Sequence, residues 1–390
     1  MGNAPKVTIF LWSYNHAKYL RDSIESLLHQ TFTDFELFIE DDASSDQSWA
    51  IIQSYKDPRI VSHRNFTNRN DSEWFKKVVS ELSSGIYIAI HHSDDIWYLD
   101  KLEKQVSFLD NHPEIGAAFT NITIIDEDSH PFEDENHFYY KIFDQPNRSR
   151  FEWLNYFFYN GNALCHPSVL IRKECFKECG FYRTGLAQLG DFDMWVRLCF
   201  KYEIYVLPEK LVRFRVRANE MNFSGNRLET RIRDQFENLQ VINLYRQINS
   251  FDDLLKIFPE TTKFDLSGKH DLGYALAMIS LEGKTQRVNK LFGLQLLFEA
   301  LNSPNRAREI ESLYNFTQRD FLILTARHDP FSIELQLKYN SQDNDPTIIT
   351  SSPTWKMAVF LENIKNKLFP PFSLRLRMAK WIAQRLFFFL

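Results

Sequence analysis

Two clusters of acidic residues follow directly after apolar stretches that read as buried strands. The first, residues 40–46, contains Asp41 and Asp42, whose oxygens can accept hydrogen bonds from a nucleobase N–H or from ribose hydroxyls. The second contains Asp94 and Asp95, and such hard oxygen ligands suit Mg²⁺ or Mn²⁺, which bridge phosphate oxygens. The competing interpretations are a helix N-cap loop for the first cluster and a solvated turn for the second.

A third carboxylate with possible chemistry is Asp191, in the stretch Gly190-Asp191-Phe192-Asp193. Asp191 begins a predicted helix over residues 191–201, where the helix dipole favours the ionised carboxylate. An ionised carboxylate can take a proton from a hydroxyl nucleophile. Plain N-capping of the helix is the alternative interpretation.

Three arginines alternate along a predicted strand over residues 211–216 and just beyond it: Arg213, Arg215 and Arg217. Alternation places them on one face of the strand. Three neighbouring guanidinium groups repel each other unless an anion lies among them, and a diphosphate fits that description. A solvated edge-strand face is the alternative.

Strands and helices alternate over the first ~120 residues, which is typical of a mostly parallel α/β sheet with helices on both faces. Ligands of such sheets bind at the carboxyl ends of the strands. The polar clusters at 13–15, 41–46 and 92–95 all fall at those ends. The strands are predicted at residues 7–12, 35–40, 59–63, 86–90, 115–120, 168–172, 204–207 and 211–216.

Beyond the sheet region the pattern changes. Residues 126–150 are polar and irregular and are predicted to form a loop or excursion. Earlier in the chain, Asp100 and Glu103 have the spacing of a helix N-cap with its reciprocal partner. From residue 228 the chain is expected to be helical, with long amphipathic segments at 228–248 and about 268–303. We therefore expect three parts: a catalytic domain over 1–225, a helical domain of unknown role over 226–372, and a basic tail over 373–390.

The tail contains four basic residues, no acidic ones, one Trp and a Phe triplet, a composition that fits an amphipathic helix in a membrane interface. A terminal helix docked on the protein's own core is the alternative. No secretory signal and no run of ~18–20 apolar residues is visible, so we expect a cytoplasmic protein, with peripheral attachment to the inner face of the cell membrane left open.

Composition narrows the function classes. The 390 residues are 44% hydrophobic and 15% aromatic, which is enough for a large core and argues against global disorder. A net charge of −5 lacks the basic footprint of a nucleic-acid binder, so no nucleic-acid partner is expected. The four cysteines form no CxxC pair, and buried free thiols are expected in preference to a zinc site at Cys175 and Cys179.

Taken in order, these pieces over residues 5–225 resemble the inverting family 2 glycosyltransferases of the GT-A fold, of the bacterial surface-polysaccharide type (O-antigen-like or capsule-like). The resemblance implies transfer of a sugar from a nucleotide-diphosphate sugar to an acceptor hydroxyl with inversion. The segments that carry it are Tyr14-Asn15, residues 41–46, 84–88 followed by 93–95, 190–195, 215–217, Asn222 and Ser224.

The resemblance also implies residue roles. Asp191 would be the general base, and Mn²⁺ or Mg²⁺ would rest on Asp94 and Asp95. The donor would be a UDP-sugar by preference, and the acceptor a saccharide or a lipid-linked saccharide. Arg69 and Lys76 are weaker candidates for the nucleotide, and Trp195 is either an acceptor wall or a core residue. The nucleotide contacts would be Tyr14, Asn15, Asp41, Asp42, Asp94, Arg215 and Arg217.

Three residues depart from the family pattern: His92 replaces a common first metal-motif Asp, Gly190 replaces a Glu, and Arg217 replaces a frequent His. These departures keep open a catalytically inactive nucleotide-sugar-binding or carbohydrate-binding scaffold. A nucleotidyltransferase on a similar sandwich is disfavoured, because such enzymes open with a Gly-rich loop and residues 13–18 contain no Gly.

Overall fold

The computed structural model describes residues 4–134, 137–218, 221–222, 224–283 and 285–333. Residues Met1–His328 form one compact unit, and the described part of the second unit is residues 329–333. The expected division at 225/226 stays a prediction. The expected tail at 373–390, and with it the end of the helical domain, lies outside the described residues.

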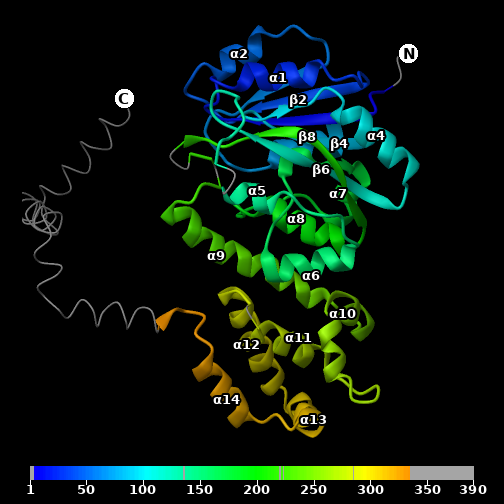
Figure 1. Ribbon diagram of the computed structural model, residues 1–390, viewed down its shortest axis with the longest axis vertical. Coiled ribbons are helices and arrows are strands. Elements are labelled where there is room, and N and C mark those ends of the chain that lie inside the picture. The colour runs from blue at the N-terminus through cyan, green and yellow to red at the C-terminus, as the bar shows by residue number, and fades with distance from the viewer. Residues whose placement is uncertain (1–3, 135–136, 219–220, 223, 284, 334–390) are drawn as a thin grey trace, which may run out of the picture. The chain divides into compact units, whose positions relative to one another are not determined.

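A single mixed sheet forms the centre of the first unit (Figure 1). Among the described residues it has eight strands in the order β3-β2-β1-β4-β7-β6-β8-β5. The four strands β3, β2, β1 and β4 pair in parallel, as do β6 and β8. Strand β7 pairs antiparallel with both β4 and β6, and β5 pairs antiparallel with β8. The strands are β1 Val7–Ser13, β2 Phe35–Asp41, β3 Ile60–Arg64, β4 Tyr87–His92, β5 Ile96–Trp97, β6 Ile115–Ile125, β7 Leu170–Arg172 and β8 Glu203–Arg215.

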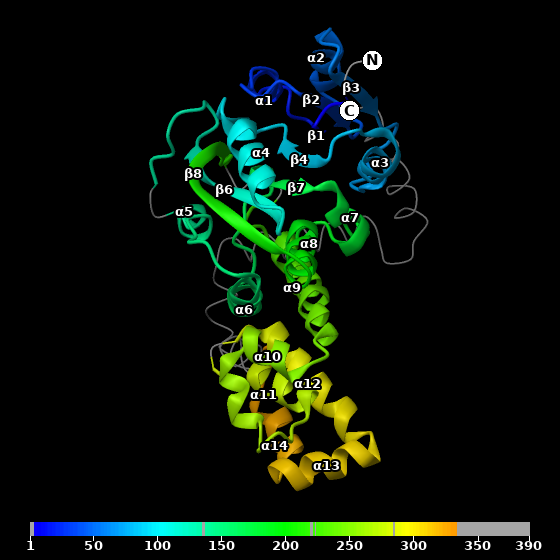
Figure 2. The same cartoon turned by 90° about the vertical axis from the view of Figure 1, so that its right-hand side faces the viewer.

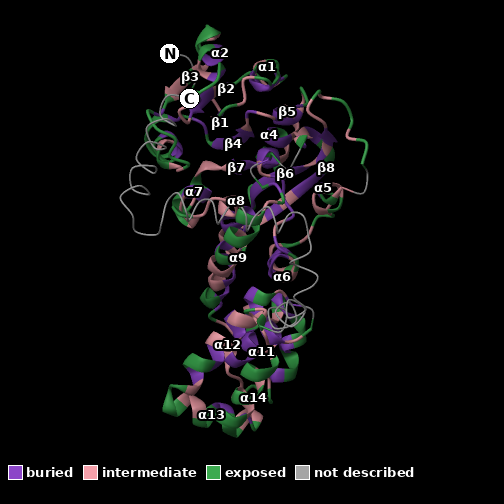
Figure 3. Ribbon diagram, turned by 90° about the vertical axis from the view of Figure 1, so that its left-hand side faces the viewer, coloured by how far each residue is buried: buried purple, intermediate pink, exposed green. Residues whose placement is uncertain are grey.

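Both faces of this sheet are covered, as Figure 3 shows by the burial of its strands. In β1, Ile9 and Leu11 join one buried apolar cluster while Phe10 joins another, because alternate side chains of a strand point to opposite faces. The helices over the first face are α1 Leu20–Leu28, α2 Ser48–Ser54 and α4 Lys101–Asn111. Those over the second are α3 Glu73–Lys77, the π-helical turn η1 Val78–Leu82, α6 Arg150–Asn160, α7 Lys173–Cys179 and α8 Gly190–Cys199.

Helices continue the chain after the sheet, and Figure 2 shows them following α9. Tyr245 is fully buried and donates its hydroxyl to the backbone oxygen of Leu154 in α6, so this region shares a core with the sheet-bearing part. The predicted α/β fold with a helical C-terminal region is confirmed. These helices are α9 Leu228–Ile242, η4 Asn243–Gln247, α10 Phe251–Ile257, η5 Pro259–Phe264, α11 Leu272–Leu281, α12 Arg287–Leu301, α13 Pro304–Tyr314 and α14 Gln318–Arg327.

Several local expectations were wrong. The strands expected at 204–207 and 211–216 are one strand, β8, because the polar residues between them form an irregularity opposite Thr120 and Asn121 instead of a turn. The segment expected at 268–303 is two helices, and Gly283, at φ +65°, follows the end of the first one.

Two further expectations concern local caps and loops. Asp100 and Glu103 form no reciprocal cap, since Glu103 accepts a hydrogen bond from Thr31 and Asp100 pairs with Lys104. The expected loop at 126–150 contains the short helix α5, Phe138–Ile142. The region expected to be a plain loop therefore contributes a helix of its own.

None of the helices within the described ranges combines the length and the apolar character needed to cross a lipid bilayer.

Gly85 lets β4 lie tightly against β1. A β-carbon at Gly85 would lie 2.5 Å from both the backbone nitrogen and Oγ1 of Thr8, so we expect Gly85→Ala to displace β4 and to lower the free energy of unfolding by about 1–3 kcal/mol. Gly190→Ala is the control, because a β-carbon there meets open space. Urea denaturation of both variants measures the effect, and equal midpoints would contradict this account of the packing.

Candidate active site

The carboxyl ends of β1, β2 and β4 meet at one edge of the sheet. Because β1 pairs in parallel with both neighbours, Ser13 lies opposite Asp41, and Trp12 lies opposite His92. The three polar clusters predicted from the sequence are therefore neighbours in space, as expected from the α/β pattern.

Asn15 connects the loop after β1 to the loop after β2. Its backbone is left-handed (φ +52°), its amide nitrogen donates to Ser44 Oγ at 2.9 Å, and its Oδ1 accepts the backbone N–H of Ser45 at 2.8 Å. Asn15 thus holds the loops together, while Tyr14 beside it is 45% exposed and free to meet a flat ligand.

Asp41 and Asp42 differ in what their oxygens already bind. Asp42 accepts backbone N–H bonds from Arg69 and Asn70, so it anchors the turn at 69–70. Asp41 is fully buried, and Arg64 lies 3.2 Å from its Oδ2. Its Oδ1 has no hydrogen-bond partner among the described residues, so Asp41 has the spare acceptor that a bound nucleotide requires.

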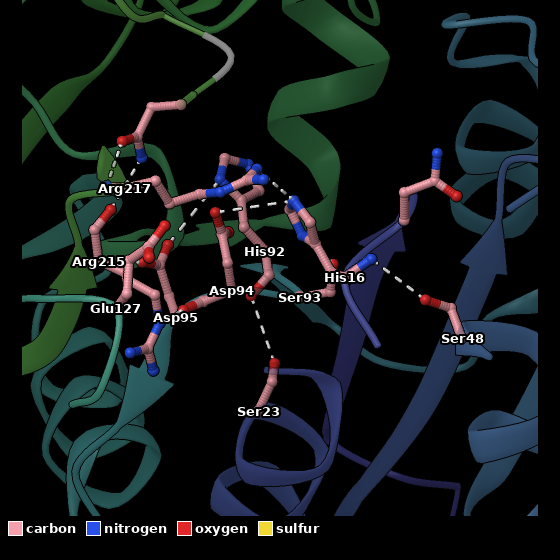
Figure 4. Close-up of polar contacts among 12 residues, drawn as sticks. His16, Ser23, Ser48, His92, Ser93, Asp94, Asp95, Glu127, Arg215 and Arg217 are labelled. Atoms are coloured by element: carbon pink, nitrogen blue, oxygen red, sulfur yellow. Dashed lines mark hydrogen bonds and ion pairs between the residues drawn. The ribbon is translucent and has the colours of Figure 1, made fainter. Parts of the chain in front are cut away.

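His92, Asp94 and Asp95 form a cluster at the end of β4 (Figure 4). Each offers one potential ligand atom, and these atoms lie within 4.8 Å of one another. Asp95 is 1% exposed, and burial together with the charge of Asp94 raises the pKa of its carboxyl well above the usual range. Its Oδ1 accepts the backbone N–H of Arg215 at 2.8 Å, but its Oδ2 has no partner in the described structure. A divalent cation fits this donor set.

Arg215 and Arg213 already donate to protein oxygens, and the predicted contact of Arg215 with a nucleotide diphosphate stays a prediction. The buried Arg215 guanidinium donates to the backbone oxygens of Asp94 and Asp126 at 2.7 Å and to Ser129 Oγ at 2.9 Å. Arg213 donates to the backbone oxygen of Ser129 at 2.6 Å. These hydrogen bonds hold the Arg215 guanidinium against the turn that carries Asp94 and Asp95.

Arg217 keeps spare donor capacity. Its Nη1 lies 2.9 Å from His16 Nε2, which must accept because arginine stays protonated, and His16 Nδ1 then donates to Ser93 Oγ at 2.8 Å (Figure 4). Burial lowers the pKa of His16. The Nε of Arg217 is buried without a partner among the described residues. The sequence analysis did not identify His16 as a site residue, because a lone His in a loop carries no pattern.

Asp191 lies in the first turn of α8, as predicted. Its Oδ2 accepts a hydrogen bond from Asn162 at 2.9 Å, and its Oδ1 accepts the backbone N–H of Phe192 at 2.7 Å. Burial raises the pKa of Asp191 to about 6, against the lowering effect of these hydrogen bonds. A carboxylate with such a pKa is ionised at neutral pH and still basic enough to accept a proton.

One segment lies between the acidic cluster and Asp191. The pKa of the buried Cys165 thiol is raised by burial and then by the charges of Asp95 and Asp191. The next residue, His166, contacts both His92 and Tyr182. The predicted roles of the carboxylates stay predictions, but both carboxylate centres lie close enough to Cys165 for their charges to raise the pKa of its thiol.

Other expectations have simple outcomes. Trp195 is fully buried and packs edge-to-face on Phe119, so it belongs to the core. Cys165, Cys175, Cys179 and Cys199 are free thiols, and Cys179 alone of the four is partly exposed.

Glu237 in α9 was missed by the sequence analysis. It is fully buried and accepts backbone N–H bonds from Ala187, Gln188 and Leu189 at 2.7–2.8 Å. These residues lead directly into α8, so α9 holds the segment that presents Asp191. No signal in the sequence distinguishes Glu237 from other acidic residues of an amphipathic helix.

Residues 8–180 match the family model described as Glycosyl transferase family 2. The uncharacterized glycosyltransferase MJ1057 of Methanocaldococcus jannaschii is 29% identical over 217 residues, which are 54% of this chain and 71% of that protein. The UDP-Glc:alpha-D-GlcNAc-diphosphoundecaprenol beta-1,3-glucosyltransferase WfaP of Escherichia coli is 33% identical over 118 residues, which are 30% of this chain and 46% of that protein. The crystal structure of S. aureus TarS 1–349 with UDP aligns at a TM-score of 0.49 and 16% identity, over 81% of this chain and 88% of that one.

Residues 8–180 are thus similar to a glycosyl transferase family 2 domain, and the enzyme class of the chain is glycosyltransferase. This confirms the predicted enzyme class.

Glu237 can be tested without knowing the substrate. Glu237→Gln removes the charge and replaces one acceptor oxygen with a donor, so at least one of three backbone N–H groups loses its partner, at a cost of about 1–3 kcal/mol. We expect a lower denaturation midpoint and faster hydrogen exchange at residues 187–189. Glu229→Gln, an exposed change in the same helix, is the control. Unchanged exchange in Glu237→Gln would show that α9 does not hold this segment.

Proposed function

We propose that this glycosyltransferase moves a sugar from a nucleotide-diphosphate sugar to an acceptor hydroxyl with inversion at the anomeric carbon. The observation that carries the proposal is the presence of two carboxylate centres near Cys165: a cluster suited to a cation, and a separate carboxylate with a pKa of about 6. In an inverting transfer, a cation in the cluster would stabilise the leaving group, and the separate carboxylate would deprotonate the attacking hydroxyl.

The donor would lie over the ends of β1, β2 and β4. The exposed ring of Tyr14 and the unpartnered Oδ1 of Asp41 supply contacts for the base and ribose, and Arg217 supplies a donor for the diphosphate. The name of the relative WfaP, which specifies a UDP-sugar donor, supports UDP as the first nucleotide to test.

Asp94 and Asp95 would hold a divalent cation, Mn²⁺ or Mg²⁺. The unpartnered, buried Oδ2 of Asp95 is the structural reason, because a buried ionised oxygen without a donor is costly unless a cation neutralises it. When bound, the cation supplies charge neutralisation for the diphosphate leaving group.

Asp191 would accept the proton of the acceptor hydroxyl. The acceptor oxygen forms the new bond to the anomeric carbon as the bond from that carbon to the diphosphate oxygen breaks, and the acceptor proton moves to Asp191. Asn162 orients the carboxylate through its bond to Oδ2. The hydrogen bonds that lower the pKa of Asp191 keep it ionised near neutral pH.

The acceptor class rests on relatives alone. WfaP is named for a lipid-linked saccharide acceptor, which supports a saccharide or lipid-linked saccharide acceptor here. The name of another relative, the putative teichuronic acid biosynthesis glycosyltransferase TuaG of Bacillus subtilis, supports a role in cell-surface polysaccharide synthesis.

Nucleotide binding tests the donor site. Calorimetric titration with UDP, GDP, CDP and dTDP should show one preferred nucleotide, and Mn²⁺ should tighten it by about tenfold or more. Asp94→Asn with Asp95→Asn should abolish the Mn²⁺ effect, whereas Asp100→Asn, a nearby exposed change, should retain it. If no nucleotide binds with or without metal, the proposal fails and an inactive scaffold replaces it.

The pH dependence of turnover tests Asp191. Because the ionised form is needed and burial raises its pKa to about 6, kcat/KM for UDP release from the donor should fall as pH drops through about 6. Asp191→Asn should lower kcat by about 10²–10⁴-fold and leave nucleotide affinity unchanged.

A second variant distinguishes the fall in kcat/KM at low pH, the acid limb of the profile, from unfolding of the protein by acid. The charge of Asp234 raises the pKa of Asp191, so Asp234→Asn should move the acid limb to lower pH with kcat retained above it. An acid limb that persists unchanged in Asp191→Asn would assign the titration to another group.

A further inference from the structure

His92 is the last residue of β4. It is 36% exposed, whereas Asp95 three residues later is buried. His92 is therefore the most exposed member of the cluster that it forms with Asp94 and Asp95, whose side chains are 13% and 2% exposed.

The two ring nitrogens of His92 have different surroundings. Nδ1 lies 4.0 Å from Asp95 Oδ2, which is too long for a hydrogen bond. Nε2 lies 3.2 Å from His166 Nδ1, and His166 Nε2 lies 2.8 Å from the Tyr182 hydroxyl. Only Nδ1 thus faces the unpartnered carboxylate oxygen.

The hydrogen bonds of this chain allow two proton arrangements. In the first, Tyr182 donates to His166, His166 donates to His92 Nε2, and the proton on His92 Nδ1 points at Asp95 across a gap too wide to bond. In the second, His92 Nε2 donates to His166, His166 donates to Tyr182, and Nδ1 keeps a lone pair directed at the cluster.

Apolar packing fixes the ring positions. Trp12 of β1 contacts His92, His166 and Tyr182, with ring centroids 5.8–6.4 Å apart. A metal-ligating imidazole ordinarily donates its second nitrogen to a fixed partner, which sets its tautomer and orientation. His166, held between Tyr182 and Trp12, is such a partner.

We propose that His92 Nδ1 is a ligand of the divalent cation held by Asp94 and Asp95, and that His166 and Tyr182 hold its ring in the metal-binding tautomer. The inference rests on the cation site of the proposed function and deepens it. A nitrogen among the ligands favours Mn²⁺ over Mg²⁺, because Mg²⁺ prefers an all-oxygen shell. His166 and Tyr182 are positioning residues.

Pulsed electron paramagnetic resonance of Mn²⁺ added to the full chain, with and without UDP, tests the bond directly. The wild-type spectrum should contain a coupling to a directly bonded nitrogen. His92→Asp should still bind Mn²⁺ but lose that coupling, and its preference for Mn²⁺ over Mg²⁺ should fall by about tenfold. His16→Gln should retain the coupling, which matters because His16 Nε2 lies 3.9 Å from Asp94.

The positioning role has its own readout. His166→Phe should weaken Mn²⁺ binding by about 10–100-fold in titrations, and Tyr182→Phe should weaken it less, because it leaves the bond between the two histidines intact. Thermal unfolding of each variant checks that it is folded.

The outcomes are distinguishable. Mn²⁺ that binds without nitrogen coupling, or with a coupling that survives in His92→Asp, overturns this inference and leaves the proposed cation site standing. If Mn²⁺ fails to bind the wild type even with UDP, the cation site and this inference fall together. Normal nucleotide binding in that case would still preserve the donor site.

Discussion

The parallel pairing of β1 with β2 on one side and β4 on the other is the constraint on which the candidate site depends. It fixes Ser13 opposite Asp41 and Trp12 opposite His92, so three loops that are distant in sequence open at one edge. A parallel strand buried on both faces has little freedom to shift, because a slip of one residue would exchange its two apolar faces. The contact of Gly85 with Thr8 tightens the same register from the opposite end of β4.

The charged side chains at this site differ in how many of their polar atoms have hydrogen-bond partners, and this difference distinguishes structural residues from candidate ligand-binding residues. Asp42 and Arg215 hydrogen-bond to backbone groups and hold turns in place. Asp41, Asp95 and Arg217 each keep one buried atom without a partner among the described residues. Leaving such atoms without hydrogen bonds costs folding free energy. Because they lie near the carboxyl ends of the strands, a bound ligand is the partner that we expect.

The helical region that follows the sheet also contributes to the candidate site. Glu237 of α9 accepts three backbone N–H bonds from the segment that leads into α8 and Asp191. It lies beyond residues 8–180, which match the glycosyltransferase family model. The position of the proposed base therefore depends on a part of the chain outside the matched domain.

The sequence alone determined the α/β class, the strand ends where the acidic clusters fall, and the start of a helix at Asp191, because hydrophobic periodicity and local turn chemistry are encoded within short windows. It did not reveal that Arg215 donates to the backbone beside Asp95, that His16 contacts Arg217, or that Glu237 holds the segment before Asp191. Those facts depend on contacts between residues about 50 to 200 positions apart, as the hydrogen bonds of Glu237 and of His16 illustrate. Only the tertiary structure decides which polar atom finds a partner, since pairing depends on distance and burial and leaves no periodic trace in the sequence.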